Sequence, residues 1–211
     1  MDNVTLDTLT DWLSRFHAAV TEQRDYLTEL DSAIGDADHG ANMARGMAAV
    51  MAKIDVARPG TVDELLKTVG MTLVSSVGGA SGPLYGTFFL RMGIACGPVC
   101  EVTPEALGSG LRAGLDGVVQ RGKAELGDKT MYDALFPALE AYAAAVAAGV
   151  GARGSIDAAA DAAVLGRDAT APMVARKGRA SYLGERSVGH LDPGATSAAM
   201  LLGSLAAAMA G

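Results

Sequence analysis

Apolar residues recur at helical spacing along almost the whole chain, and this periodicity is the feature that most constrains the fold. The first segment places apolar side chains three or four residues apart, at Leu6, Leu9, Leu13, Phe16 and Val20. A later segment repeats the spacing at Leu107, Leu111, Leu115 and Val118. The apolar and polar alternation typical of strands is scarce. The sequence therefore predicts an all-α protein.

Glycine, proline and capping residues divide this pattern into eight predicted helices. We expect them near residues 5–31, 42–55, 62–77, 84–96, 104–121, 130–149, 155–176 and 195–210. The short connections favour antiparallel packing of consecutive helices, and many small Gly and Ala side chains allow close approach of their backbones. We expect an eight-helix antiparallel up-and-down barrel or bundle. Residues 1–211 contain no convincing linker and are predicted to form a single domain.

Charge and composition exclude several classes of partner. Lys and Arg number 17 and Asp and Glu 24, a formal net charge of −7, with no dense basic run. We therefore expect neither nucleic acid nor a membrane as partner. The most apolar segment, 195–210, is interrupted by Ser and Gly and is short for a bilayer span, and residues 1–4 (MDNV) do not begin the basic and then apolar pattern of a signal peptide. These features, with Cys96 and Cys100 interpreted as reduced thiols, predict a cytoplasmic protein.

The most informative motif is an acid-rich segment that follows the first predicted helix. Asp31, Asp36 and Asp38 fall within eight residues, where the helix dipole is already negative. No Lys or Arg lies between Arg24 and Arg45 to compensate them. A site made of carboxylates alone, without Cys, favours magnesium over zinc or iron. The segment therefore predicts a site for a hard divalent cation.

An alternative interpretation of the same segment remains open. Aspartate and glycine are ordinary turn residues, so Asp38 or Asn42 could simply cap the next helix. An EF-hand is excluded, because counting from Asp31 puts Ala33 and Gly35 where that loop needs side-chain ligands.

Two further segments have the composition of a phosphate site. Residues 75–83 (SSVGGASGP) precede a helix start, where main-chain amides and the helix dipole can bind an anion. Residues 175–182 (ARKGRASY) place three basic residues within four positions, and HLDPGAT at 190–196 enters the last helix. Each segment alone equally suits an ordinary turn or a cationic helix end. Together with the acidic segment they favour binding of a magnesium nucleotide diphosphate.

These motifs, with RGKA at 121–124 and GDKTM at 127–131, closely resemble the DhaL family, the nucleotide-binding subunits of dihydroxyacetone kinase. The resemblance implies an eight-helix barrel with the nucleotide at the loops of one end. It implies that Asp31, Asp36 and Asp38 ligate two magnesium ions. It also implies that the nucleotide is bound by His39, Gly40, Ala41, Asn42, Ala80, Ser81, Gly122, Met131, Arg179, Asp192, Pro193 and Gly194. Three carboxylates and a diphosphate sum to about −6, which two divalent cations reduce to about −2.

The family works in two modes, and the chain resembles the second more closely. In one mode the module belongs to an ATP-dependent kinase. In the other, bound ADP is phosphorylated by a phosphohistidine protein of the phosphotransferase system and passes the phosphoryl group to dihydroxyacetone on a separate subunit. The length of the chain leaves no room for a ketone-binding domain, so we expect activity only with partners. A His39 phosphocarrier, and a non-catalytic module that signals to a regulator protein, are the competing hypotheses.

Overall fold

The computed structural model describes residues 3–211, and within them the chain is almost entirely helical. Nine α-helices span α1 (Leu6–Glu22), α2 (Arg24–Ile34), α3 (His39–Ala57), α4 (Val62–Ser76), α5 (Ser81–Cys96), α6 (Pro104–Gly122), α7 (Met131–Ala147), α8 (Ala152–Ala169) and α9 (Pro193–Ala210). The remaining elements are the 3-10 helix η1 (Arg179–Ser187) and two short strands, β1 (Val4–Thr5) and β2 (Glu101–Val102). The all-α prediction is confirmed.

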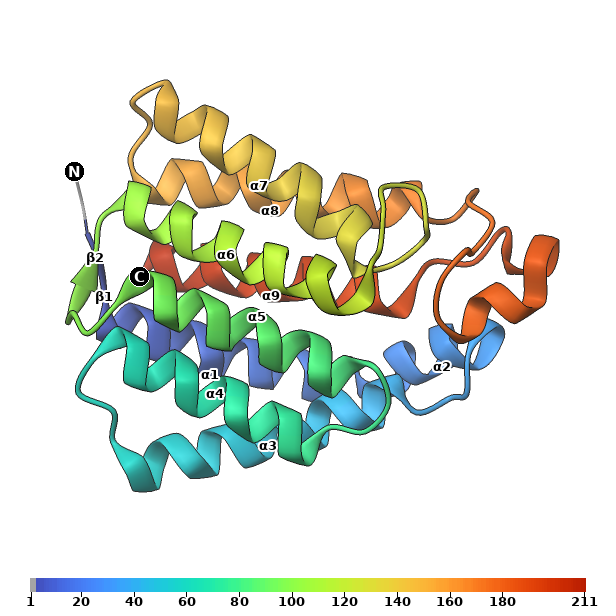
Figure 1. The fold of residues 1–211 in the computed structure, drawn as a ribbon, viewed down its shortest axis with the longest axis horizontal. Helices are drawn as coiled ribbons and strands as arrows, with labels where there is room; N and C mark the ends of the chain where they lie inside the picture. The colour runs from blue at the N-terminus through green and yellow to red at the C-terminus, as the bar shows by residue number, and fades with distance from the viewer. Residues whose placement is uncertain (1–2) are drawn as a thin grey trace.

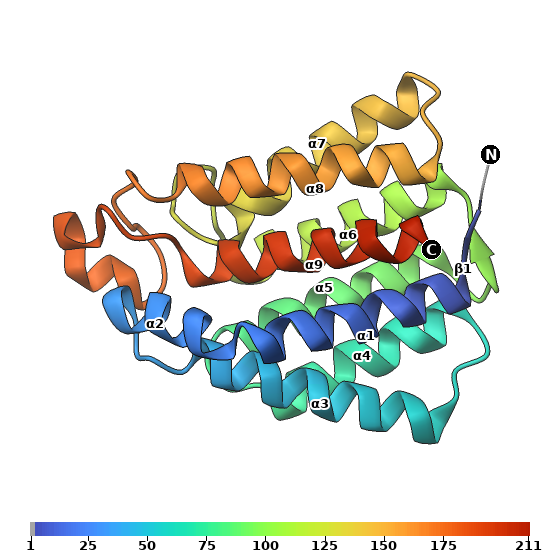
Figure 2. The ribbon, with the colours of Figure 1, turned by 180° about the vertical axis from the view of Figure 1, so that it is seen from behind.

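The eight long helices form two layers of four (Figures 1 and 2). One layer contains α3, α1, α9 and α8, and the other contains α4, α5, α6 and α7. The layers join where α3 packs on α4 and where α7 packs on α8. Successive long helices run in opposite directions, as predicted for an up-and-down arrangement (Figure 1). The barrel form of this bundle stays a prediction.

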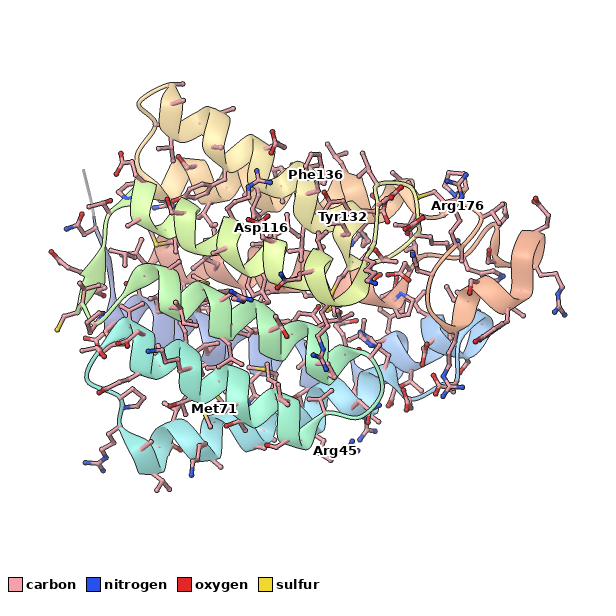
Figure 3. The ribbon with its side chains drawn as sticks, in the orientation of Figure 1. Arg45, Met71, Asp116, Tyr132, Phe136 and Arg176 are labelled. Atoms are coloured by element: carbon pink, nitrogen blue, oxygen red, sulfur yellow. The ribbon has the colours of Figure 1, made fainter. Side chains whose placement is uncertain are left out.

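This alternation brings four distant connections to one end of the bundle. The connections at 35–38, 77–80, 123–130 and 170–192 lie at the end that carries α2 and η1 (Figure 1). Arg176 lies at this end in Figure 3, beyond the ends of the long helices. The C-terminus and the β1–β2 pair, which aligns Val4 with Val102, lie at the opposite end. The fold therefore places the predicted binding segments together.

Capping residues fix where the helices around this end begin. The Thr130 side chain accepts a hydrogen bond from the Tyr132 N–H at 3.2 Å, and Asp133 completes a capping box. Asp192 caps α9 by accepting from the Ala195 N–H at 2.6 Å, with Pro193 in the first helical position. At the opposite end of the bundle, Thr103 and Pro104 begin α6 in the same way, as the sequence predicts.

The core between the layers is built from aromatic and aliphatic side chains. Trp12 is fully buried against Phe89, with ring centroids 5.6 Å apart, and its Nε1 donates to the carbonyl of Leu201 at 2.8 Å. On the opposite edge Tyr132 and Phe136 of α7 lie toward α6 (Figure 3). A Cβ placed on Gly70 would lie 2.7 Å from the carbonyl of Gly86, so glycine allows α4 and α5 to pack closely.

Helix α9 is the one helix of residues 3–211 that is long and apolar enough to cross a membrane by composition. In the structure 61% of it is buried, which suits a helix at the centre of a folded core.

Several predicted helix boundaries differ from the structure by three residues or more, and the helices expected from 84 and 155 begin at Ser81 and Ala152. The helix expected over 5–31 breaks at Gln23, because the apolar spacing from Val20 to Leu27 equals two turns and hides the change of direction. The helix expected from residue 42 begins at His39, because the carboxylate of Asp31 caps its free amides. The helix expected to reach 176 ends at Ala169.

The early end of α8 has a physical cause in the sequence that follows it. Pro172 has no N–H to continue the helix, and the Thr170 hydroxyl turns back to donate to the carbonyl of Arg167 at 2.6 Å. The released residues form the long α8–α9 connection, 170–192, which contains η1. Neither η1 nor the two short strands were predicted.

Candidate functional site

A cavity of about 720 Å³ opens at the loop end of the bundle. Eleven of the fifteen predicted site residues line it: Asp31, Asp36, Asp38, His39, Ala80, Ser81, Met131, Arg179, Asp192, Pro193 and Gly194. A second cavity of about 380 Å³ adjoins it and is lined by Gly122. Asp31 and Gly194, the outermost of these residues in the sequence, are 163 positions apart, and only the topology brings the segments together.

The acidic residues form one cluster at the C-terminal end of α2. Each of Asp31, Asp36 and Asp38 offers a carboxylate oxygen that lies within 4.8 Å of the other two. Asp31 is buried, and its Oδ2 accepts from the N–H groups of Asp38 at 2.9 Å and His39 at 3.1 Å. These bonds fold the segment back, so that carboxylates of both helix ends converge. The cluster provides the oxygen donors that a hard divalent cation requires.

Gly35 lies where this segment turns, close to the carboxylate of Asp31. A Cβ on Gly35 would lie 2.0 Å from Oδ1 of Asp31, so a larger residue there would displace that carboxylate. Ala37 adopts a positive φ of 61°, an uncommon conformation for a residue with a side chain. The backbone at Gly35 and Ala37 therefore makes the tight turn that brings the carboxylates of the three aspartates together.

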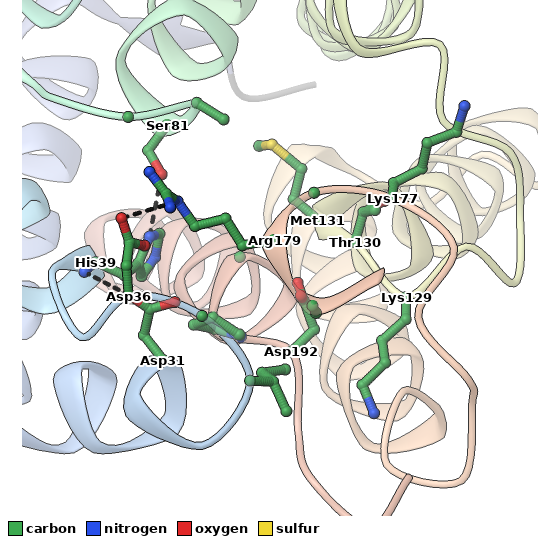
Figure 4. Close-up of a pocket in the computed structure, with 18 of the residues that line it drawn as sticks. Asp31, Asp36, His39, Ser81, Lys129, Thr130, Met131, Lys177, Arg179 and Asp192 are labelled. Carbon is green, nitrogen blue, oxygen red and sulfur yellow. Dashed lines mark hydrogen bonds and ion pairs between the residues drawn. The ribbon is translucent and has the colours of Figure 1, made fainter. Parts of the chain in front are cut away.

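Arg179 lies at the exposed edge of the acidic cluster. Its Nε is 2.9 Å from Oδ2 of Asp36, and the two side chains meet across the cavity mouth (Figure 4). Both side chains contact solvent, so the ion pair contributes little to stability. Its value is positional, because it brings a guanidinium from η1 beside the carboxylates.

His39 is held between two serines behind the acidic cluster. Its Nδ1 lies 3.0 Å from Ser81 Oγ, and its Nε2 lies 2.9 Å from Ser197 Oγ. The Tyr85 hydroxyl lies 2.7 Å from the same Ser197 Oγ. The imidazole is only 7% exposed, and burial lowers the pKa of His39, against the opposing charges of Asp31 and Asp38. At neutral pH it is an uncharged ring with a fixed orientation.

The start of α9 forms another wall of the cavity. Asp192 is buried, and burial raises the pKa of its carboxyl to about 7, although the hydrogen bond from Ala195 opposes this shift. Pro193 and Gly194 follow in the first turn and line the cavity. The N-terminus of a helix, with its free amides, suits an anionic group there.

The adjoining cavity has a different chemical character. Its wall combines apolar side chains of α5, α6 and α7, namely Leu84, Val118 and Met131, with Gly122 at the end of α6 and Ala124 in the connection that follows. A Cβ on Gly122 would approach Leu84 to 3.3 Å, so a larger residue would narrow the space. Such a slot suits a flat, largely apolar ring system.

Three predicted residues line neither cavity. Gly40 faces α2, where an added Cβ would lie 2.0 Å from the carbonyl of Arg24. Ala41 is exposed, and Oδ1 of Asn42 accepts a hydrogen bond from Arg45 at 2.5 Å. The structure places Gly40 in helix packing, and contacts of these three residues with a nucleotide stay a prediction.

Several residues of the site escaped sequence reasoning. Tyr85 and Lys129 line the larger cavity, and Ser197 supports His39 from behind. No spacing rule connects Tyr85 or Ser197 to the acidic segment. The sequence offers a signal for Lys129, because the residue directly precedes Thr130, a typical helix N-cap, in a segment between two predicted helices.

Comparison with known proteins identifies the family of the chain. The DAK2 domain model matches residues 33–207. The chain is 46% identical over 200 residues to the ADP-binding subunit DhaL of the PEP-dependent dihydroxyacetone kinase of Escherichia coli, with 95% of each chain covered. It is 43% identical to the ADP-binding subunit DhaL of the PTS-dependent enzyme of Lactococcus lactis, covering 96% of this chain and 97% of that protein.

Solved structures show the same fold. A crystal structure of the dihydroxyacetone kinase of C. freundii in complex with AMP-PNP and Mg²⁺ superposes with a TM-score of 0.72 at 26% identity. The match covers 98% of this chain and 35% of that one, so the chain spans about a third of that kinase.

The helical bundle, with an acidic cluster and two adjoining cavities at one end, has the fold of a kinase domain of known structure, and the chain belongs to the DAK2 domain family. Within that family, its full-length relatives are the separate DhaL ADP-binding subunits of dihydroxyacetone kinase. The resemblance drawn from the sequence motifs is confirmed.

Proposed function

We propose that this chain is the nucleotide-carrying subunit of a dihydroxyacetone kinase. In this proposal, magnesium-bound ADP receives a phosphoryl group from a phosphohistidine protein of the phosphotransferase system and passes it to dihydroxyacetone on a separate subunit. The observation that carries the proposal is the cluster of Asp31, Asp36 and Asp38, within 4.8 Å of one another at the wall of a polar cavity. We further propose that residues 1–211 act as one cytoplasmic module that a regulator protein can also contact.

The donor chemistry of the acidic cluster fits magnesium. The cluster contains only carboxylates, one of them buried, and its excess negative charge requires a cation beyond the single guanidinium of Arg179. Asp31, Asp36 and Asp38 would hold the metal, and the charge of three carboxylates plus a diphosphate favours two ions. When bound, magnesium supplies positive charge to phosphate oxygens during phosphoryl transfer.

The two adjoining cavities fit the two ends of a nucleotide. We assign the polar cavity to the diphosphate, with Ala80 and Ser81 at the start of α5 and Asp192, Pro193 and Gly194 at the start of α9. We assign the smaller cavity, lined by Gly122 and Met131, to the adenine ring.

The residues of the chain act by positioning and by charge. Neutral His39 can donate a hydrogen bond from Nδ1 to the Ser81 hydroxyl, which faces the cavity. Because burial lowers its pKa, the ring adds no positive charge to the site. Arg179 offers an exposed positive charge at the mouth, where it would stabilise charge on a transferred phosphoryl group. The proposed mechanism uses no nucleophile from this chain, because phosphoryl transfer depends chiefly on alignment and charge neutralisation.

The alternatives differ in how the nucleotide is loaded. An ATP-dependent kinase would use the same site with free ATP as donor. A His39 phosphocarrier would have to present a ring nitrogen to a partner protein. Both ring nitrogens are hydrogen-bonded to serine hydroxyls, and the residue is only 7% exposed. This burial favours the nucleotide as the carrier.

A transfer experiment tests the proposal. The protein, loaded with MgADP, is incubated with a ³²P-labelled phosphohistidine donor protein, then denatured and fractionated. We expect the label in ATP, and its transfer to dihydroxyacetone when a substrate-binding subunit is added. Acid-labile label on this chain would instead support the His39 phosphocarrier. Turnover with ATP but not with the phosphoprotein would support the ATP-dependent kinase.

A further inference from the structure

Lys129 is a buried lysine beside the cavity, and the proposed function does not yet use it. The side chain is 1% exposed, although lysine is rarely buried without a partner. The residue also adopts a positive φ of 63°, which is strained for any residue but glycine. A buried charge and a strained backbone both oppose folding, so the contacts of this ammonium must offset them.

Those contacts are three backbone carbonyls of the α8–α9 connection. The Lys129 Nζ donates to the carbonyl oxygen of Ser187 at 2.6 Å, to that of Met173 at 3.1 Å and to that of Ala171 at 3.5 Å. An ammonium has three donors, so the three carbonyls match its full capacity. One side chain of the α6–α7 connection thus joins the two ends of the segment 171–187.

Neighbouring bonds hold the same segment. The Arg176 N–H donates to the carbonyl of Asp128 at 3.1 Å, so consecutive residues of the α6–α7 connection both bind it. Inside the segment, Ser187 Oγ accepts from the Ala175 N–H at 2.9 Å and donates to the carbonyl of Gly184 at 2.6 Å. Lys129 lies at the centre of this arrangement.

The segment that Lys129 holds carries the basic side of the cavity. Arg176, Lys177 and Arg179 all line the cavity and all lie between the carbonyls that Lys129 binds. The Lys129 side chain itself points away from Asp36 and Arg179, toward the connection that it binds (Figure 4). Its ammonium is therefore directed at the backbone of the segment rather than at the acidic cluster.

We propose that Lys129 is a positioning residue for nucleotide binding, which acts by pinning the segment 171–187 so that its basic side chains face the phosphate site. The effect on nucleotide affinity rests on the proposed function, whereas the effect on the segment itself does not. Removal of the ammonium should free the segment without removing any group that touches the nucleotide.

The test compares Lys129→Met with Lys123→Met, which removes the same charge from an exposed position on the same connection. Amide hydrogen exchange is measured without nucleotide, and the dissociation constant for MgADP is measured by calorimetry. For Lys129→Met we expect exchange at Ala175, Arg176 and Gly189 to accelerate at least tenfold while α1 and α4 keep their protection. We expect MgADP affinity to fall at least tenfold. The Lys123 variant should match the wild type in both.

A double-mutant cycle separates positioning from direct contact. If Lys129 acts through Arg179, then Lys129→Met should cost at least threefold less affinity in an Arg179→Ala background than in the wild type. Equal losses in both backgrounds, with unchanged exchange in 171–189, would show a direct contact and overturn the proposal. Exchange that accelerates across the whole chain would also overturn it, because the role would then be general stability.

A second variant covers a failure of Lys129→Met to fold. Ser187→Ala removes the bonds to Ala175 and Gly184 from within the segment and leaves the buried ammonium in place. It should accelerate exchange at Ala175 and weaken MgADP binding in the same direction, and a variant identical to the wild type in both would contradict the proposal. If the wild type itself fails to bind MgADP, the proposed function fails, while the exchange measurements still decide the role of Lys129.

Discussion

At the residue scale, the site depends on a few side chains that are held in place by hydrogen bonds to named partners. Asp31 is the clearest case, because one of its oxygens caps α3 through the amides of Asp38 and His39 while its other oxygen faces the turn at Gly35. The same carboxylate thus shapes the segment and contributes to the acidic cluster. Asp36 and Asp38 are more exposed than Asp31.

Asp36→Asn is predicted to separate binding from folding. The side chain is exposed and paired only with Arg179, so the melting temperature should stay within about 2 °C of the wild type. Loss of one carboxylate should weaken MgADP binding at least tenfold, about 1.4 kcal/mol. Calorimetry measures the affinity, and Asp25→Asn on the exposed side of α2 is the control. An Asp36 variant that binds as tightly as this control would contradict the assignment.

Alanine substitution of the two serines that hold His39 should have different effects, one mainly on stability and the other mainly on MgADP affinity. Ser197→Ala leaves a buried ring nitrogen and the Tyr85 hydroxyl without their shared partner, which should cost about 1–3 kcal/mol of unfolding free energy in urea titration. Ser81→Ala removes a partner at the cavity wall, so it should cost less stability and more MgADP affinity. The reverse order of the two effects would show that Ser81, rather than Ser197, is the structural partner.

At the scale of the elements, features fixed by neighbouring residues could be predicted from the sequence, and features fixed by contacts between distant residues could not. The start of α6 at Thr103 and Pro104 follows from local chemistry and could be predicted. The start of α3 could not, because its cap is Asp31, a residue of the preceding helix. The path of 170–192 depends on Lys129, which is remote in sequence and adjacent only in the folded chain.

The cap of α9 predicts a pH dependence of stability. The pKa of Asp192 is about 7 in the folded chain against an ordinary value of 3.8, so between these values the folded state binds the extra proton. Its contribution to unfolding free energy therefore falls as pH rises from about 4 to 7, by up to about 1.4 kcal/mol per pH unit. Asp192→Asn keeps an acceptor for Ala195 but has no charge to bury.

This effect is measured by urea titration of both proteins, without metal or nucleotide, between pH 4 and 8. The variant should gain stability relative to the wild type as pH rises to 7, and the difference should be constant above that. A difference that does not change with pH would show that the Asp192 carboxyl titrates near its ordinary value.

Two glycines in helices predict opposite results for the same substitution. Gly40→Ala would place a Cβ 2.0 Å from the carbonyl of Arg24, so α2 and α3 must separate, at a cost of at least about 2 kcal/mol. Gly203→Ala in α9 meets nothing within 4 Å and should stabilise by about 0.4–1 kcal/mol. Thermal unfolding measures both. Equal effects would mean that the approach of α3 to α2 does not require glycine.

At the scale of the whole molecule, the alternating helix directions explain why a site can form from segments so far apart. Every second connection returns to the same end, so the segments at 31–38, 78–81, 129–131 and 176–194 surround one cavity. The helix count and short connections predict this convergence. The order of side chains around the cavity, including Tyr85 behind His39, depends on packing between layers, which no local pattern encodes.

The central claim is that the acidic cluster binds cations that in turn bind a nucleotide diphosphate. Calorimetric titration of ADP into the protein, with magnesium and then with a chelator, tests it most directly. The account predicts one ADP per chain with magnesium, and affinity at least a hundredfold weaker with the chelator. Equal affinity under the two conditions, or no binding of ADP with magnesium present, would contradict it.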